Sequence, residues 1–132
     1  MSRTFFILGT ALAFVCVAAG ALGAHVLQDR LSAELLSAWE TGARYGIVHA
    51  LALLITSTAM ARWPGSLWTA AGWLFAGGAL VFSGSLFGLA LSGARGLGAV
   101  TPIGGLAMLL GWVVSSAAAW KNMRGRPRDG AA

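Results

Sequence analysis

The chain has 132 residues, of which 58% are hydrophobic and 10% are charged, and its formal net charge is +5. Because soluble domains carry charge on roughly a quarter of their residues, this composition excludes a soluble globular protein and predicts a surface that faces lipid. The positive charge does not indicate nucleic-acid binding, because much of it is gathered beside an apolar segment near the C-terminus, where basic residues set membrane topology. The residues in question are Lys121, Arg124, Arg126 and Arg128.

Four segments are long and apolar enough, or nearly so, to cross a bilayer core, which takes about 20 residues. In chain order they are residues 4–23, 45–61, 67–91 and 102–120. We predict an all-α fold: an integral membrane bundle of four transmembrane helices over residues 1–120, followed by a basic, disordered tail over 121–132. The alternative for the first segment is a cleaved signal peptide, because it starts with a basic residue and ends in small residues.

The segment 25–44 differs from the rest of the chain, because it holds three of the four acidic residues. Leu35, Leu36, Trp39 and Ala43 are spaced as on one face of a helix, and polar residues occupy another face. We therefore expect a short amphipathic helix at the membrane surface between the first and second spans, with Ser32 as its N-cap. The sequence leaves open whether this helix turns or runs straight into the second span.

Two short connections follow. Pro64 and Gly65 fit poorly inside a helix and predict a turn between the second and third spans. Thr101-Pro102 predicts the start of the fourth helix, with Thr101 as N-cap and proline at the first helical position.

The distribution of Lys and Arg predicts the orientation in the membrane. With four spans, both termini and the 62–66 turn share one side, which holds Arg3, Arg62, Lys121, Arg124, Arg126 and Arg128. The other side holds Arg30, Arg44 and Arg95. We therefore expect a multi-pass protein of the bacterial inner (plasma) membrane with both termini in the cytoplasm.

Small residues repeat at four-residue steps along the spans and predict close helix packing, which association in lipid requires. The residues assigned to this packing are Gly20, Gly72, Ala76, Gly84, Gly88, Ala107, Gly111 and Ser115. The lone Cys16 lies in the first apolar run and is expected to be a packed, inert thiol.

A polar cluster is predicted near the outer mouth of the bundle. Tyr45, His49 and Thr56 share one helix face, and that face should point inward because an ionisable side chain facing lipid is costly. Glu40 and Arg44 are four residues apart and can pair on the helix surface. The full cluster comprises His25, Glu40, Arg44, Tyr45, His49 and Thr101. A structural fastening and a ligand or proton site are both open as roles for it.

The sequence also resembles a known family. GALGAH (20–25), WETGARYGIVHALALL (39–54), FSGSLFGLAL (82–91) and GAVTPIGGLAMLLGW (98–112) are similar to the successive signatures of the domain of unknown function 423 family, which includes YgdD-like and transmembrane protein 256-like proteins. The resemblance runs from about residue 5 to residue 120. It implies a four-span membrane protein without an assigned activity. It marks Gly23, His25, Trp39, Tyr45, His49, Ser83, Gly84, Thr101, Pro102, Gly104 and Gly105.

The chain lacks the common motifs of metalloproteases, phosphate-binding loops and serine hydrolases, so we do not expect an enzyme. Three function classes stay open. The first is an accessory, assembly or scaffold subunit of a membrane complex, with other membrane proteins or a second copy as partner. The second is a small transporter or channel that acts as an oligomer. The third is haem or metal binding by His25 and His49, although we assign no cofactor and no metal.

Overall fold

Four long α-helices account for most of the structure. The computed structural model describes residues 1–124, which contain no β-strand. The helices are α1 (Ser2–Leu22), α2 (Ala33–Arg62), α3 (Ser66–Ser92) and α4 (Thr101–Arg124), with a π-helical turn η1 (Gly23–Leu27) after α1 and a 3-10 turn η2 (Arg95–Ala99) before α4. All four helical segments are long and apolar enough to cross a membrane. The predicted all-α, four-span fold is confirmed.

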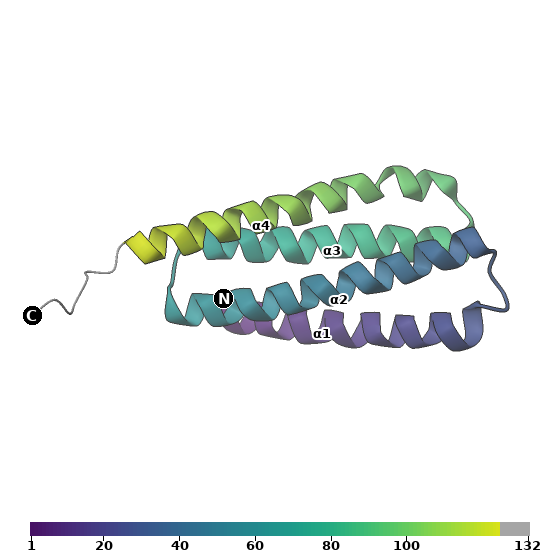
Figure 1. Cartoon of the computed structure of the whole chain (residues 1–132), viewed down its shortest axis with the longest axis horizontal. Helices are drawn as coiled ribbons and strands as arrows, with labels where there is room; N and C mark the ends of the chain where they lie inside the picture. Colours follow the sequence, from purple (N-terminus) through teal and green to yellow (C-terminus); the bar gives the residue numbers. More distant parts are fainter. Residues whose placement is uncertain (125–132) are drawn as a thin grey trace, which may run out of the picture.

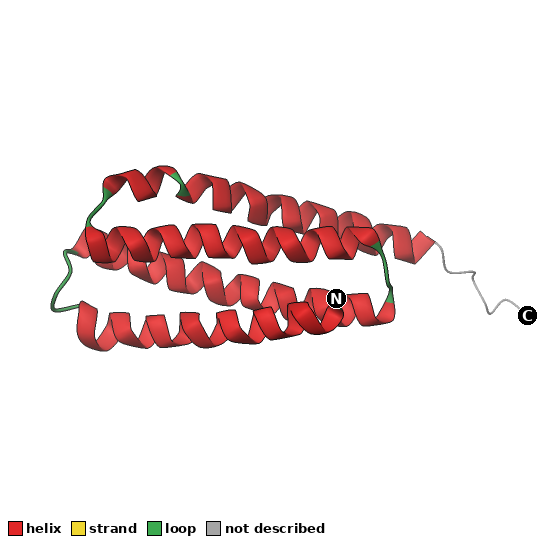
Figure 2. Cartoon of the chain, turned by 180° about the vertical axis from the view of Figure 1, so that it is seen from behind, coloured by secondary structure: helices red, strands yellow, loops and turns green. Residues whose placement is uncertain are grey.

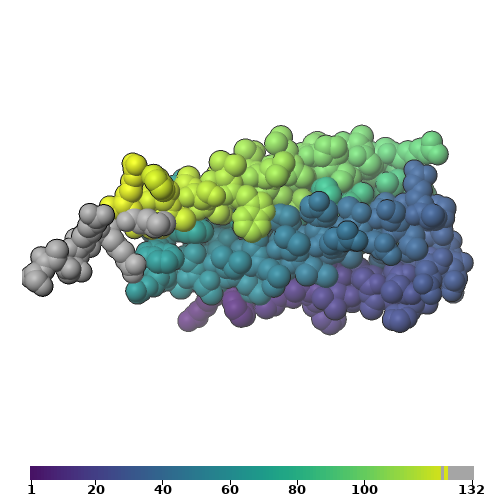
Figure 3. Space-filling view, in the orientation of Figure 1, coloured from purple at the N-terminus to yellow at the C-terminus, as the bar shows by residue number. Residues whose placement is uncertain are grey.

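The helices alternate in direction along one long axis (Figures 1 and 2). The N-terminus, the α2–α3 turn and the last residues of α4 therefore lie at one end, here called the terminal end, and the other two connections lie at the opposite loop end. The helices pack in chain order, α1 on α2, α2 on α3 and α3 on α4. In the space-filling view α1 and α4 form opposite long edges of the molecule (Figure 3).

The expected surface helix is not a separate element, because residues 33–62 form one continuous helix. Its first turns are held against the bundle: Trp39 and Ala43 are buried with Ala19, Leu27 and Ala90. The apolar face that predicted contact with the membrane surface is thus covered by protein. At 1.5 Å per residue α2 is about 45 Å long, which exceeds the roughly 30 Å hydrocarbon core, so α2 reaches into the headgroup region.

The helix ends follow local rules. The Ser32 side chain caps α2 by accepting a hydrogen bond from the Leu35 N–H at 3.4 Å. The predicted turn at Pro64-Gly65 separates α2 from α3. Gly93 ends α3 with φ of 68°, a left-handed conformation that glycine adopts without strain. The helix α4 starts at Thr101 itself and ends at Arg124, so the first four residues of the predicted tail, 121–124, are helical. The other tail residues, 125–132, lie outside the described residues.

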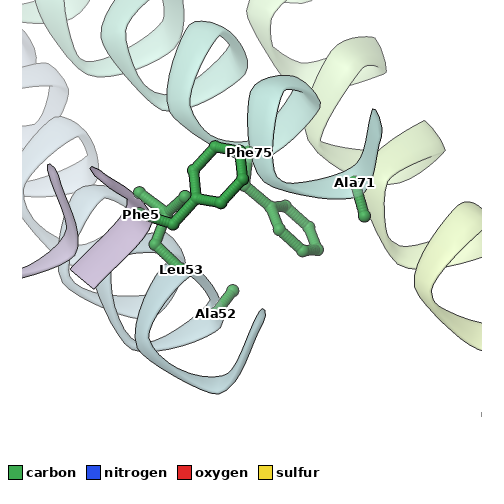
Figure 4. Close-up of a cluster of buried hydrophobic side chains, with 5 residues drawn as sticks. All are labelled: Phe5, Ala52, Leu53, Ala71 and Phe75. Carbon is green, nitrogen blue, oxygen red and sulfur yellow. The ribbon is translucent and has the colours of Figure 1, made fainter. Parts of the chain in front are cut away.

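One core cluster, in the half of the bundle toward the terminal end, packs aromatic rings against small residues (Figure 4). Phe5, Leu53 and Phe75 are almost fully buried beside Ala52 and Ala71. The Phe5 ring from α1 lies where a side chain at Gly72 of α3 would be, since a Cβ there would meet the ring at 2.5 Å. The Phe75 ring occupies the matching space beside Gly111 of α4, at 2.7 Å.

Candidate functional site

Buried polar side chains link the helices through hydrogen bonds to backbone carbonyls. The Trp39 indole Nε1–H donates to the Ala19 carbonyl at 2.7 Å, joining α2 to α1. The Ser83 hydroxyl donates to the Gly42 carbonyl at 2.8 Å, joining α3 to α2. A carbonyl oxygen has two lone pairs, so it can accept these bonds without losing its helical one. In lipid such bonds contribute to helix association, where burial of apolar side chains does not.

Further links lie toward the two ends. At the terminal end the Ser57 hydroxyl donates to the Ser2 carbonyl at 2.9 Å and fixes the start of α1 against α2. Toward the loop end the hydroxyls of Ser85 and Thr101 lie 2.7 Å apart and join α3 to α4.

His49 lies at the centre of this arrangement and is 4% exposed. Its Nδ1 lies 2.8 Å from the Tyr45 carbonyl oxygen, and its Nε2 accepts a hydrogen bond from the Trp112 indole N–H at 3.2 Å. A carbonyl only accepts and an indole N–H only donates. The geometry therefore requires a neutral imidazole with its proton on Nδ1.

Aromatic rings enclose the imidazole. The ring centroids of His49 and Phe75 are 5.7 Å apart, those of His49 and Trp112 are 6.1 Å apart, and those of Phe75 and Trp112 are 4.9 Å apart. We call these three residues the His49 cluster. It joins α2, α3 and α4 and leaves neither ring nitrogen of His49 free.

This arrangement offers little to a metal or haem. Axial ligation of haem iron needs a ring nitrogen with a free lone pair, and Nε2 already accepts from Trp112. Within residues 1–124 no group of three or more His, Cys, Asp or Glu side chains could hold a metal ion. A buried imidazole whose two nitrogens are both hydrogen-bonded is suited to holding the helices together.

The other members of the predicted polar cluster lie nearer the surface. Glu40 and Arg44 are exposed on α2, and His25 is exposed in η1. Tyr45 is 46% exposed, with its ring 5.2 Å from that of Phe82. Thr101 is half-buried and contacts Ser85. His25 and Thr101 lie at the loop end, and Glu40, Arg44 and Tyr45 lie in the half of α2 toward that end, whereas His49 lies near the middle of α2. Within residues 1–124 one side-chain hydrogen bond joins two of the six, that from His49 to the Tyr45 carbonyl.

The predicted packing residues divide into two groups. Gly72, Gly88 and Gly111 face side chains so closely that a Cβ would meet them at 2.5 to 2.9 Å, and Ala76, Ala107 and Ser115 are half-buried. Gly20 and Gly84 differ from the expectation, because no heavy atom lies within 4 Å of a Cβ built there. Each step of four residues turns an α-helix about 40° beyond a full turn. From Gly72 to Gly84 the repeat has therefore rotated about 120°, away from the neighbouring helices.

The tightest contact between two helix backbones at the glycines was not predicted from the sequence. At Gly104 a Cβ would lie 2.5 Å from the Phe82 backbone nitrogen, and at Gly78 it would lie 2.9 Å from the Met108 backbone nitrogen. The backbones of α3 and α4 thus touch here. The available signal was the paired glycines at 77–78 and 104–105, because adjacent glycines leave about 100° of a helix surface without side chains and so permit close approach of a neighbouring helix.

A groove runs along the lipid-facing side of α1 and α3. It has a volume of about 410 Å³. Its lining is entirely apolar and consists of Leu8, Ala11, Leu12 and Val15 from α1, Leu53 from α2, and Trp73, Ala76, Gly77 and Leu80 from α3. We call it the α1–α3 groove. The small side chains among these residues make it hollow, and Trp73 and Leu80 on its rim are 53% and 73% exposed.

Comparison with known proteins places these features in a family. A family model described as "Protein of unknown function (DUF423)" matches residues 19–105. The chain is 42% identical over 118 residues to a UPF0382 membrane protein of Staphylococcus epidermidis, covering 85% of this chain and 91% of that protein. It is 38% identical over 122 residues to the UPF0382 membrane protein YwdK of Bacillus subtilis, covering 92% and 99% of the two chains. No solved structure matches.

Proposed function

The chain belongs to the DUF423 family and is a multi-pass membrane protein, and we propose that it acts as an accessory, assembly or scaffold subunit of a membrane complex. In this proposal a transmembrane helix of a partner protein occupies the α1–α3 groove. The protein contributes a rigid apolar surface to the complex and carries out no chemical step.

The shape of the α1–α3 groove is the observation that carries this proposal. Lipid chains solvate a flat apolar surface as well as leucine does, so helices associate in a bilayer through close packing, which small residues permit. In the groove Ala11, Ala76 and Gly77 provide such close approach between the larger rim residues Trp73 and Leu80. A Cβ at Gly77 would have no heavy atom within 4 Å, which leaves space for the side chains of a partner helix.

Three buried polar groups of the bundle support an accessory role over transport or cofactor binding. The hydroxyls of Thr56 and Ser83 and the ring of His49 all form hydrogen bonds within the protein. Phe5 and Phe75 fill the space between the helices. Conduction or ligand binding would need some of these groups to be free.

The orientation in the membrane belongs to the same proposal. We place the terminal end in the cytoplasm of a bacterium and the loop end on the far side of the plasma membrane. The excess of Lys and Arg at the terminal end supports this orientation through the positive-inside rule.

Association of the intact protein tests the proposal. The tagged full-length chain is extracted in a gentle detergent and analysed by native electrophoresis and mass spectrometry, as wild type, as Gly77→Leu and as Ala117→Leu. Ala117 is exposed on α4, and no residue of α4 lines the groove, so its variant is the matched control. We expect a discrete complex that Gly77→Leu disrupts at least several-fold and Ala117→Leu preserves, with unchanged thermal stability in both.

The identity of the co-purified chains then decides the partner. A different membrane protein in the complex supports the proposal as stated, and a second copy of this chain makes the groove a homo-oligomer interface. A wild-type protein that is strictly monomeric, without co-purifying chains, would contradict it.

A further inference from the structure

A second hollow lies between the first turns of α2, the end of α3 and η2, which meet at the loop end of the bundle (Figure 1). Its volume is about 450 Å³, within the range of sites that bind small molecules. The residues that line it include Ser32, Glu34, Leu35, Leu89, Gly93 and Arg95. Unlike the apolar α1–α3 groove, it combines charged and apolar side chains. We call it the loop-end pocket.

Two residues of opposite charge line the loop-end pocket. Glu34 belongs to the first turn of α2, and Arg95 is the first residue of η2. Both side chains are exposed, and in the described part of the chain no nitrogen–oxygen contact within 4.0 Å joins them. A lone anion in the pocket would be repelled by Glu34, and a lone cation would be repelled by Arg95. A ligand that carries both charges would be attracted by both residues.

The charged and apolar residues of the pocket lie at different depths along the bundle. Helix α3 runs toward the loop end, so Leu89 lies deeper than Arg95, which follows α3. Helix α2 runs away from the loop end, so Ala38 lies deeper than Glu34. Both apolar side chains, Leu89 and Ala38, are half-buried. The pocket is therefore charged on its outer side and apolar on its inner side.

A bilayer changes from apolar to charged at the same level. With 27 residues, α3 is about 40 Å long, which exceeds the roughly 30 Å hydrocarbon core by about 5 Å at each end when the helix is centred. The last turn of α3, from Leu89 to Ser92, then lies at the boundary between acyl chains and headgroups. A phospholipid has its charges outside this boundary and its chains inside it. The polarity of the loop-end pocket therefore matches that of a phospholipid.

The lining also distinguishes between kinds of ammonium group. A carboxylate such as that of Glu34 binds a primary ammonium by accepting hydrogen bonds from its N–H groups. A quaternary ammonium has no N–H group and is bound by cages of aromatic rings, and none of the described residues that line the pocket is aromatic. The guanidinium of Arg95 has a fork of donors that matches phosphate oxygens. The pocket therefore fits a primary ammonium close to a phosphate.

We propose that the loop-end pocket binds the headgroup of phosphatidylethanolamine. The Arg95 guanidinium donates to the phosphate oxygens, the Glu34 carboxylate accepts from the primary ammonium, and the apolar inner side contacts the first carbons of the acyl chains. Free phosphoethanolamine is the soluble source of the same chemistry. The inference concerns a different surface from the α1–α3 groove and does not rest on the proposed function.

Native mass spectrometry of the full-length protein in a maltoside detergent tests the site. The protein is offered equal amounts of phosphatidylethanolamine, phosphatidylcholine and phosphatidylglycerol with the same acyl chains. The pocket variants are Glu34→Gln and Arg95→Gln. The matched controls are Glu40→Gln and Arg44→Gln, because these two residues are exposed on α2 and do not line the pocket. Thermal unfolding in the same detergent checks that all four variants fold.

We expect the wild type to retain phosphatidylethanolamine in preference to the other two lipids. Glu34→Gln should remove the preference over phosphatidylcholine, because the carboxylate reads the ammonium. Arg95→Gln should lower retention of phosphatidylethanolamine about fivefold, as for the loss of one exposed charge pair. Both control variants should retain this lipid as the wild type does.

A second arm separates the two sources of the headgroup. Phosphoethanolamine is titrated into lipid-free protein, and its binding is measured by calorimetry with the wild type and with Glu34→Gln. Binding that Glu34→Gln abolishes, without selective retention of phosphatidylethanolamine, would overturn the assignment to a phospholipid. Equal retention of the three lipids without binding of phosphoethanolamine would overturn the site itself. Retention that both pocket variants leave unchanged, or that the controls lower as much as the pocket variants do, would also overturn it.

Discussion

At the scale of single residues, the hydrogen-bond partners of the buried polar groups could not be predicted from the sequence. Helical spacing places His49 and Thr56 on one face of α2, and the structure buries both. The hydrogen-bond donor to His49, however, is Trp112, 63 positions further along the chain. Spacing within one helix does not fix the rotation of another helix about its own axis. The same limit applies to Trp39, whose acceptor is the carbonyl of Ala19.

The His49–Trp112 hydrogen bond can be measured with a double-mutant cycle. Trp112→Phe and His49→Leu each remove one partner and leave the other unpaired, so the double variant should lose less stability than the sum of the two. We expect a coupling free energy of about 0.5–1.5 kcal/mol from unfolding in detergent. Trp120→Phe combined with His49→Leu is the control and should give no coupling. Additive effects in the first cycle would mean that the bond does not stabilise the protein.

A separate variant tests whether His49 is a structural residue or a ligand or proton site. His49→Gln keeps a polar side chain that can donate and accept. If the residue is a fastening, as the saturation of its two nitrogens supports, this variant should lower thermal stability in detergent and leave association with partners intact. Loss of a host phenotype or of a bound ligand at unchanged stability would instead identify a ligand or proton site.

At the scale of helices, glycine patterns predicted that the helices pack closely but not where they cross. A repeat of four residues drifts around the helix by about 40° per step, so Gly72 and Gly84 of one repeat point in different directions. The tightest approach of a glycine to the backbone of another helix joins Gly78 to Gly104. Which of two adjacent glycines faces the neighbouring helix depends on how both helices are rotated about their own axes. These rotations cannot be derived from a single sequence.

Adjacent glycines in α4 provide a sharp test of this crossing. A Cβ at Gly104 would lie 2.5 Å from the Phe82 backbone nitrogen, whereas a Cβ at Gly105 would lie at an ordinary 3.6 Å from the Phe82 ring. Gly104→Ala must push two backbones apart and should cost about 1–3 kcal/mol of stability. Gly105→Ala should be neutral or slightly stabilising. Equal effects of the two variants in thermal unfolding would contradict the crossing.

A second pair of glycines separates packed from open positions. Gly111→Leu would collide with the Phe75 ring, which lies 2.7 Å from a Cβ at that site, whereas Gly84 faces open space. We expect Gly111→Leu to prevent folding or to lower the melting temperature strongly, and Gly84→Leu to change stability by less than about 0.5 kcal/mol. Size-exclusion chromatography and thermal unfolding in detergent measure both. Strong destabilisation by Gly84→Leu would show that its face is packed.

At the scale of the whole molecule, composition and hydropathy were enough to predict four spans, because the bilayer imposes both the length and the apolar character of each helix. The extent of α2 was not predictable, since residues 33–44 carry charges on one face and their apolar face could rest on lipid or on protein. In the structure this apolar face rests on protein, because Trp39 and Ala43 pack against the bundle. The α1–α3 groove depends on how three helices are arranged, which no single segment encodes.

The proposed orientation of the molecule rests on the positive-inside rule and can be tested with reporter fusions. The predicted four-span topology assigns six Lys and Arg residues to the side of both termini and three to the other. A green fluorescent protein fused to the C-terminus should therefore fluoresce, and alkaline phosphatase fused there should be inactive. Alkaline phosphatase placed in the 93–100 connection should be active. Phosphatase activity at the C-terminus would contradict this topology and indicate the opposite orientation.

Photo-crosslinking in intact membranes tests most directly the claim that the α1–α3 groove holds a partner helix. A photoactivatable residue at position 77 lies in the groove, where the structure leaves open space. The same residue at position 109 is the control, on the lipid-facing side of α4, where Leu109 is 65% exposed. We predict a discrete protein adduct from position 77 and none from position 109. The absence of any protein adduct at position 77, or the same adducts from both positions, would contradict the account.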